Sequence, residues 1–415
     1  MMSLEALFSQ ALGIESPWII TGVAFDSVKK RLDIKVDFSK GSTFSSADAS
    51  TGDTKEYKAY DTVEKTWRHL NFFEHECYLN VRTPRIRPDS GGIKLIAPPW
   101  SGISPGFTLL FEAFLVKMCT HMPVHQVGKL LKILDRKIWN LLDSYVAKGL
   151  EANDNSGTTK LGMDETSLKK GHNYITLFVD LLHKKTIHIS SGKDHKTVHD
   201  FVKSLESSKG DRMKITDVSC DMSPAFIKGV KECFPKSHIT FDKFHVLKLI
   251  NEAVDSVRRS EVIDHDCLKG ARFAVLKNQS NLTVKQAETR ENLSKRNLKT
   301  MRAIHIRESF QAIYLAETVS DFLSLLKEWY FWATHSRLEP IKKVAKTIKR
   351  HWDGILRWKE SQINNGLLEG LNSVIQAAKR KARGYKIKHF KTMAFLLTGK
   401  FNFEAINPHL PTQIA

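Results

Sequence analysis

The sequence predicts an α/β fold in which a mixed sheet is interrupted by a large helical insertion and preceded by a small β unit and three helices. Three observations lead to this prediction. Residues 161–241 alternate strand-like and helix-like segments, residues from about 245 to 360 carry apolar side chains at helical spacing only, and residues 22–99 mix strand-like stretches with loops. At 415 residues, the chain is long enough to divide into several domains.

The small β unit is predicted to span residues 1–100. Residues 31–38 alternate apolar and polar side chains, as in a strand with one buried face, and residues 77–81 form a further strand. Residues 39–54 are rich in Gly, Ser, Thr and Asp, which indicates a loop. The Pro- and Gly-rich residues 84–99 are expected to wrap over this unit.

Three helices are predicted within residues 101–152. Phe107 and Phe111 begin an apolar stripe on the first helix, Pro123 can open the second, and Asp135 can cap the third. This succession fits a helix-turn-helix module, although the usual turn glycine is missing. A three-helix packing unit with no role in DNA binding fits the pattern equally well.

A second domain is expected after the polar linker at residues 151–160. We predict strands at residues 161–165, 174–181, 186–190, 214–220 and 238–241, and helices at residues 198–205 and 224–234, the latter capped by Ser223. The resulting order, β-β-β-α-β-α-β, is typical of a ribonuclease H-like sheet, whose first part we assign to residues 160–250.

Strand patterns stop after Phe244, so residues 251–360 are predicted to be a helical insertion. A last helix is expected from about residue 365 to residue 383, with Gly384 at its C-terminal cap. Residues 361–405 would therefore contain the final helix of the sheet domain and a basic C-terminal segment.

The composition indicates which kinds of partner the chain can bind. There are 64 Lys and Arg against 45 Asp and Glu, and this net charge of +19 attracts polyanions such as nucleic acid. No apolar run approaches the ~20 residues needed to cross a bilayer, so no membrane association is expected. The five cysteines include no CxxC pair, which is typical of reduced thiols in a cytoplasmic protein.

Two aspartates are placed where strands of the predicted sheet give way to polar turns. Asp164 ends the first strand and Asp221 follows the fourth, and these strands are neighbours in a ribonuclease H-like sheet. Each aspartate alone could simply cap a turn. Together they fit a site in which carboxylates from separate elements hold divalent metal ions for phosphodiester transfer.

A third carboxylate, Glu369, lies on the last helix. Asn365, Glu369, Asn372 and Gln376 recur at helical intervals and form one polar stripe, while the other face is apolar. The stripe continues into cations that could follow a phosphate backbone, at Lys379, Arg380 and Arg383. The alternative is a solvated helix with a run of charge.

Four segments resemble the DDE transposases of bacterial insertion sequences of the ISL-three group. They are GMDETSLKKGHNY at residues 162–174, CDMSPAFIKGV at 220–230, HITFDKFHVLKLIN at 238–251 and NNGLLEGLNSVIQAAKRKARGY at 364–385. Weaker likeness covers residues 66–88 and 98–115. The four stronger segments are specific in this order and spacing, whereas any one alone would be weak.

The resemblance implies an enzyme that binds the inverted-repeat ends of its mobile element, nicks them with activated water and joins the 3′ hydroxyls to target DNA. By the family pattern, Asp164, Asp221 and Glu369 would be the catalytic residues and would hold two Mg²⁺ or Mn²⁺ ions. Asp242, His245, Asn365 and Asn372 are candidates for a supporting shell around them. The residues expected to contact DNA are Lys379, Arg380, Lys381, Arg383 and Lys386.

The expected partners are therefore double-stranded DNA, as terminal repeats and as target, and a second copy of the chain in a synaptic homodimer. The expected location is the bacterial cytoplasm, at the nucleoid. Members of this family commonly carry an N-terminal zinc module, but residues 37–41 and 88–92 contain no such ligands, and His75 and Cys77 are too close together to complete a tetrahedral site. We therefore predict a degenerate end-recognition unit at residues 1–100 without zinc.

Two other functions remain open on the sequence. A DNA-binding protein on a transposase scaffold could occupy terminal repeats without cutting, although it would have no need for three carboxylates. A structure-selective nuclease of ribonuclease H-like fold would share the metal site but would not need a helix-turn-helix module of its own.

Overall fold

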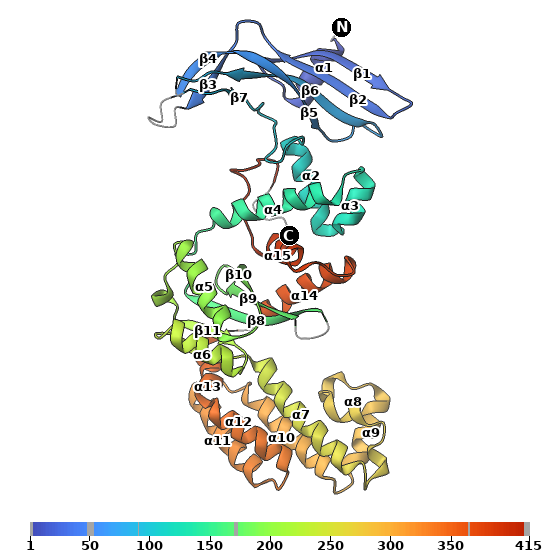
Figure 1. Ribbon diagram of the computed structural model, residues 1–415. Helices are drawn as coiled ribbons and strands as arrows, with labels where there is room; N and C mark the ends of the chain where they lie inside the picture. The colour runs from blue at the N-terminus through green and yellow to red at the C-terminus, as the bar shows by residue number, and fades with distance from the viewer. Residues whose placement is uncertain (1–2, 48–53, 90, 170–172, 364–365, 411–415) are drawn as a thin grey trace. The chain divides into compact units, whose positions relative to one another are not determined.

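The computed structural model describes residues 3–47, 54–89, 91–169, 173–363 and 366–410. Figure 1 labels its helices and strands. By its internal contacts, the chain divides into two compact units. One consists of Met1–Asn153 together with Ile375–Ala415, and the other of Asp154–Val374. We call them the terminal unit and the central unit.

The terminal unit begins with a helix and a mixed sheet in which most strand pairs are antiparallel. Its elements are α1 (Leu4–Leu12), β1 (Trp18–Asp26), β2 (Arg31–Phe38), β3 (Thr43–Ala47), β4 (Thr54–Lys58), β5 (Asp61–Arg68), β6 (Glu76–Ile86) and β7 (Lys94–Leu95). The strand order is β1-β2-β6-β5, β7 pairs with β6, and β3 and β4 form a separate hairpin. The strand predicted from the alternating pattern of β2 is confirmed, and the one predicted at residues 77–81 lies within the longer β6.

The prediction of a loop at residues 39–54 is wrong in part, because β3 lies within it. Phe44 gives the physical reason. Its side chain is buried and packs against Trp18 and Phe38, so the segment is held as a strand by aromatic packing with residues distant in sequence.

Three helices follow in the terminal unit, as predicted: α2 (Leu109–His121), α3 (Val124–Leu131) and α4 (Asp135–Glu151). Lys132 adopts the left-handed backbone conformation, with φ of 54°, where the turn glycine was missing. The prediction that Asp135 caps α4 is wrong by one residue, since Leu134 occupies the cap and Asp135 is the first helical residue. The Asp135 carboxylate instead pairs with His125, at 3.1 Å.

The C-terminal helix α15 (Ile387–Thr398) packs on α4 in the same unit. The His389 ring stacks on Trp139 with centroids 3.9 Å apart, and Lys388 forms an ion pair with Asp143. Segments far apart in the sequence therefore build one helical layer.

The sheet of the central unit has the order β10-β9-β8-β11-β12. β9 runs antiparallel to β8 and β10, whereas β11 is parallel to both β8 and β12. Its elements are β8 (Lys160–Lys169), β9 (Asn173–Asp180), β10 (Lys185–Ser191), α5 (His195–Ser207), a 3-10 turn (Arg212–Lys214), β11 (Asp217–Cys220), α6 (Pro224–Cys233) and β12 (His238–Phe241).

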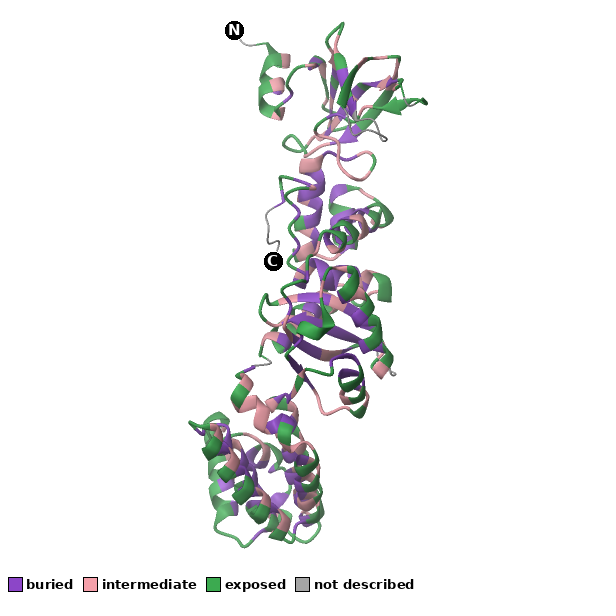
Figure 2. Cartoon of the chain, turned by 90° about the vertical axis from the view of Figure 1, so that its left-hand side faces the viewer, coloured by how far each residue is buried: buried purple, intermediate pink, exposed green. Residues whose placement is uncertain are grey.

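The predicted order β-β-β-α-β-α-β is present in this unit. The strand predicted from residue 214 begins only at Asp217, because the preceding residues form the 3-10 turn. Buried side chains concentrate in the sheet and on the inner faces of the helices (Figure 2), where Phe178 of β9 stacks on Phe201 of α5 with centroids 4.4 Å apart.

The segment after β12 is helical, as its apolar spacing predicts. It contains α7 (Lys243–Glu261), α8 (Arg272–Leu276), α9 (Val284–Ser294), α10 (Lys299–Ile313), α11 (Val319–His335), α12 (Glu339–Arg350) and α13 (Trp352–Ser361), with 3-10 turns at Asp266–Leu268 and Gln279–Asn281. Buried polar groups fix these helices to one another. Glu261 accepts hydrogen bonds from the first two amides of α10, at 2.7 Å each, and the fully buried Arg307 donates to the carbonyls of Val275 and Leu276, at 2.9 Å.

The last helix of the sheet domain is α14 (Gly366–Lys381). Its end is marked by left-handed conformations at Arg383 and Gly384, and the Gly384 amide donates to the Lys379 carbonyl at 3.0 Å. The predicted glycine thus lies just past the helix, where it closes the last turn. Among the helices that the structure describes, none has the length and apolar character required to span a bilayer.

We predict that protonation of His69 destabilises the terminal unit at acid pH. Burial lowers the pKa of His69 to about 4, with a further contribution from His409, whereas the unfolded chain takes up its proton near the ordinary value of 6.5. Stability is therefore fully present above that value and is lost as the pH falls toward 4. Urea denaturation at pH 7 and pH 5 should show a loss of about 2 kcal/mol attributable to this residue.

The His69→Gln variant is the matched control, because its amide can still bond the Thr108 hydroxyl but does not titrate. An equal pH dependence of stability in both proteins would contradict the assignment.

Candidate active site

Three aspartates lie level with one another across three neighbouring strands of the central sheet. Ser219 of β11 pairs with Gly162 of β8 on one side and with Thr240 of β12 on the other. Two residues further along the chain from these three lie Asp164, still within β8, and Asp221 and Asp242, directly after β11 and β12. Because parallel strands in register carry their side chains to a common edge, the sheet itself brings these three carboxylates to one region.

Asp164 does not end its strand, contrary to the prediction from sequence. β8 continues to Lys169 because β9 extends with it as an antiparallel pair, with Glu165 opposite Thr176 and Thr166 opposite Ile175. Asp164 instead lies where the parallel neighbour β11 ends. The sequence signal for the longer strand is the absence of glycine and proline between Asp164 and Gly171.

The aspartates are held by backbone amides. Asp164 accepts from the Glu165 amide at 2.8 Å, and Asp221 accepts from the Ser223 amide at 2.9 Å. Asp242 is the N-cap of α7 and accepts from the Phe244 amide at 2.9 Å. Each carboxylate therefore has one oxygen fixed by the main chain, which restricts the directions in which its other oxygen can turn.

Negative charge at this site is only partly compensated. Burial raises the pKa of Asp164 to about 6, His245 opposes this shift, and the neighbouring charges of Asp242 and Asp221 add to it. Burial and the charge of Asp221 likewise raise the pKa of Glu165. Two adjacent, partly buried carboxylates with raised pKa values, Asp164 and Glu165, are a favourable place for a cation, because a cation stabilises the ionised forms that burial disfavours.

His245 lies one turn into α7, with its Nε2 3.7 Å from Asp242 Oδ2. Sequence analysis named both residues as supporting candidates, and the structure brings both into the electrostatic surroundings of Asp164. The sequence alone does not point to Glu165 as a site residue, because the predicted strand ends at this position.

The helix α14 docks against β8 through two contacts in the central unit. Leu368 is buried, and its methyl groups lie about 3.0 Å from the position that a Cβ on Gly162 would take. Asn372 donates from Nδ2 to Asp164 Oδ2. Two residues of strand and four of helix both advance roughly 6 to 7 Å, so α14 runs along β8 at this point.

Glu369 lies between these two contacts on α14 but is exposed. On a helical wheel it is roughly 60° from Asn372 and roughly 100° from Leu368, so it belongs to the flank of the docked face. In the part of the chain that the structure describes, no three His, Cys, Asp or Glu side chains are grouped closely enough to hold a metal ion. The structure thus brings Asp164, Asp221 and Asp242 into one electrostatic neighbourhood. Glu369 lies one turn before Asn372, on the helix that contacts Asp164, and has no contact with the aspartates among the interactions of the described residues.

The remaining predicted residues lie on or after α14. Asn365 lies outside the described residues. Lys379, Arg380 and Lys381 form the last turn of α14, Arg383 follows it, and Lys386 is the N-cap of α15. All of these cations except the half-buried Lys379 are exposed.

A family model described as a transposase, of the DDE class and the ISL3 group, matches residues 161–394. The chain belongs to this transposase family. The matched region begins in β8 and ends in α15, so it contains all three strands of the aligned aspartates, the helical insertion and the whole of α14.

Two transposases of known insertion sequences are similar to this one. The transposase for insertion sequence element IS1001 of Bordetella parapertussis is 25% identical over 80% of this chain and 84% of its own length. The transposase for insertion sequence element IS1557 of Mycobacterium tuberculosis is 25% identical over 78% of each chain.

We predict that a single methyl group at Gly162 loosens the docking of α14 in this transposase. In Gly162→Ala, the new Cβ would meet Leu181 at 2.8 Å and Leu368 at 3.0 Å, so the helix or both leucines must move. The expected result is a loss of about 1 to 3 kcal/mol in the free energy of unfolding.

Gly370→Ala is the control on the same helix, because nothing lies within 4 Å of its added methyl group. It should be neutral or stabilising by about 0.5 to 1 kcal/mol. Equal effects of the two substitutions in thermal denaturation would show that close approach at Gly162 is not a constraint.

Proposed function

We propose that this transposase cuts and joins DNA at the inverted-repeat ends of its insertion sequence, with Asp164, Asp221 and Glu369 as the catalytic carboxylates. The observation that carries the proposal is the alignment of aspartates on adjacent strands with α14 docked beside them. The sheet order β10-β9-β8-β11-β12 supports a ribonuclease H-like fold for the central unit, because β9 runs antiparallel to the other four strands, and β11 and β12 are each reached through a helix.

The residues at this site fit Mg²⁺ or Mn²⁺. The set consists mainly of carboxylate oxygens, which these hard cations prefer. Asn372 supplies an independent sign, because its Oδ1 is buried and finds no hydrogen-bond partner among the described residues, while its Nδ2 is committed to Asp164. A buried acceptor of this kind beside a desolvated carboxylate can be satisfied by a cation or by a water molecule.

Asp164, Asp221 and Glu369 would hold the metal ions. When bound, two divalent ions neutralise charge on the phosphate and favour ionisation of the attacking water or hydroxyl. Asn372 keeps the Asp164 carboxylate turned toward α14, and the Ser223 amide keeps Asp221 turned toward the same edge. His245 stabilises the ionised form of Asp164 across the site.

DNA would be held by the cations that continue α14 beyond Glu369. Arg380, Lys381, Arg383 and Lys386 are exposed, and such side chains contact backbone phosphates without reading sequence. Recognition of the terminal repeat falls to the terminal unit, through the β sheet of residues 1–100 and a helix-turn-helix formed by α3 and α4. Synapsis of two ends calls for a homodimer.

A second candidate is a protein that binds terminal repeats without cutting. It is favoured by one observation, the absence of a closed three-carboxylate group within the described part of the chain. The two candidates differ in one respect: a cutting enzyme needs the carboxylates, whereas a protein that only binds DNA does not.

We expect Asp164→Asn, Asp221→Asn and Glu369→Gln each to abolish cleavage of a terminal-repeat substrate in Mg²⁺ while leaving DNA binding nearly intact. Each change removes a charge that the metal site needs but keeps the size of the side chain. Gel assays of nicking and mobility shift give the two readouts. Asp200→Asn, an exposed residue of α5, is the matched control and should cut normally.

Full cleavage by any one of the three variants would remove that residue from the site. Absence of cleavage by the unaltered protein in Mg²⁺ and in Mn²⁺, with repeat binding intact, would favour the second candidate.

We expect the double variant Arg380→Ala with Arg383→Gly to bind all DNA sequences more weakly. Glycine is chosen at position 383 because the backbone there is left-handed, with φ of 58°. The slope of log affinity against log salt should become shallower by about two. Lys285→Ala, which removes an exposed cation of α9, serves as the control. An unchanged salt slope in the double variant would show that the end of α14 is a solvated helix that does not contact DNA.

A further inference from the structure

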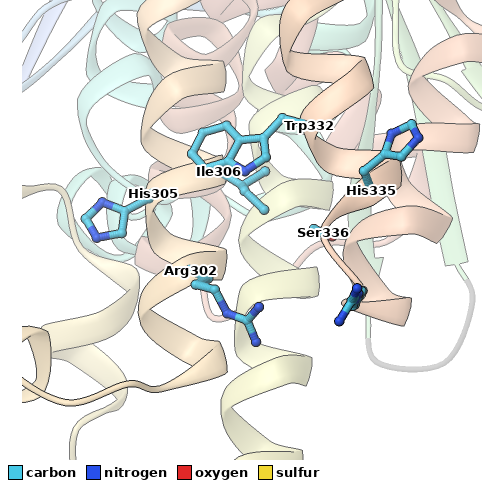
Figure 3. A pocket seen from close by; sticks show the side chains of 7 residues that line it. Arg302, His305, Ile306, Trp332, His335 and Ser336 are labelled. Carbon is cyan, nitrogen blue, oxygen red and sulfur yellow. The ribbon is translucent and has the colours of Figure 1, made fainter.

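The helical insertion carries a pocket that the proposed function does not use. Its volume is about 550 Å³, within the range of ligand sites, and it lies between α10 and the C-terminal end of α11. Figure 3 shows Arg302, His305 and Ile306 along one helix and Trp332 and His335 along the neighbouring one. Arg337, in the turn after α11, also lines it.

The pocket is positively charged and has no internal counter-charge. Its lining contains two arginines and two histidines but no carboxylate. Arg302 and Arg337 are exposed, and their side chains form no ion pair or hydrogen bond with any residue that the structure describes. The flanking sequence adds to this charge, with four Lys or Arg and no acid in residues 295–305, and six against one acid in residues 335–350. Such a surface attracts an anion.

Trp332 adds an aromatic surface to the same pocket. Trp329, three residues earlier, provides the packing of α11, because it is 3% exposed and its indole nitrogen donates to the Ile306 carbonyl at 2.8 Å. Trp332 is instead 44% exposed. An indole beside unpaired guanidinium groups is the combination that binds single-stranded nucleic acid, since the ring stacks on a base and the cations hold the phosphates.

We propose that this pocket binds an unpaired segment of a DNA strand, with Arg302 and Arg337 on backbone phosphates and Trp332 stacked on an exposed base. The inference rests on the proposed function only in taking DNA as the partner. A fully paired duplex offers phosphates to the arginines but no free base to the indole. The pocket therefore favours DNA that carries an unpaired segment over a fully paired duplex.

The test compares two probes on the full-length chain: a fluorescein-labelled duplex and the same duplex with an unpaired single-stranded tail. Fluorescence anisotropy gives the affinities. Trp332→Ala should weaken binding of the tailed probe about tenfold and leave the paired duplex unchanged. Arg302→Ala with Arg337→Gly should weaken both probes and reduce the salt slope by about two.

The variants are chosen to preserve the fold. Arg337 has φ of 58°, which glycine adopts without strain, and Trp332 is too exposed to be a core residue. Phe273→Ala removes an aromatic ring that is 60% exposed elsewhere in the insertion, and Lys327→Ala removes an exposed cation of α11 outside the pocket. Both control variants should bind the two probes as the unaltered protein does.

Equal affinity of Trp332→Ala and unaltered protein for the tailed probe would overturn the proposal. So would competition by a free mononucleotide as strong as that by tailed DNA, which would show a small-molecule site instead. Either result, obtained while Asp164→Asn still abolishes cleavage, removes only this inference. Failure of the unaltered protein to bind any DNA would overturn the proposed function as well.

Discussion

The docking of α14 on β8 is the contact on which the candidate active site depends. Asp164 and Asp221 are brought together by strand pairing, but Glu369 belongs to a helix that follows the sheet only after the whole insertion. Leu368 against Gly162 sets how closely this helix approaches, and Asn372 on Asp164 sets its position along the strand. A bulkier residue at position 162 would move the third carboxylate away without touching any of the three.

The insertion meets this requirement by returning to the strand from which it starts. At the beginning of the insertion, Asp242 directly follows β12 and caps α7. At the end of the insertion, Gly354 of α13 lies against Phe241, the last residue of β12. Arg357 of α13 also pairs with Asp217 at the start of β11, at 2.9 Å. Since entry and exit are both fixed at the sheet, the length between them has little effect on where the chain re-enters. Within the insertion, Glu261 links the end of α7 to the start of α10.

How far the sequence predicts this structure depends on whether local or distant contacts decide each element. The strands β2 and β12 and the amphipathic helices follow from apolar spacing, which is a local property. β3 could not be predicted because burial of Phe44 against Trp18 decides it, and the length of β8 depends on its pairing with β9. The sequence predicts Asp242 only as a supporting residue, because its alignment with Asp164 follows from the register of the strands. The polar stripe of α14 suggests Asn372, but it does not reveal the hydrogen bond from Asn372 to the Asp164 carboxylate.

The distribution of charge indicates the order in which DNA and metal ions would bind in the proposed function. The chain as a whole is strongly basic, yet the edge of its central sheet gathers carboxylates whose ionisation is opposed by burial and by one another. A phosphate group would be repelled there unless cations came first, because like charges in a partly buried site interact strongly. The surface cations of α14 and of the pocket at Trp332 carry no such restriction, so DNA can be held before the site is competent to cut it. In the proposed function, metal ions would control the chemistry and basic side chains the binding, so substitutions would affect the two separately.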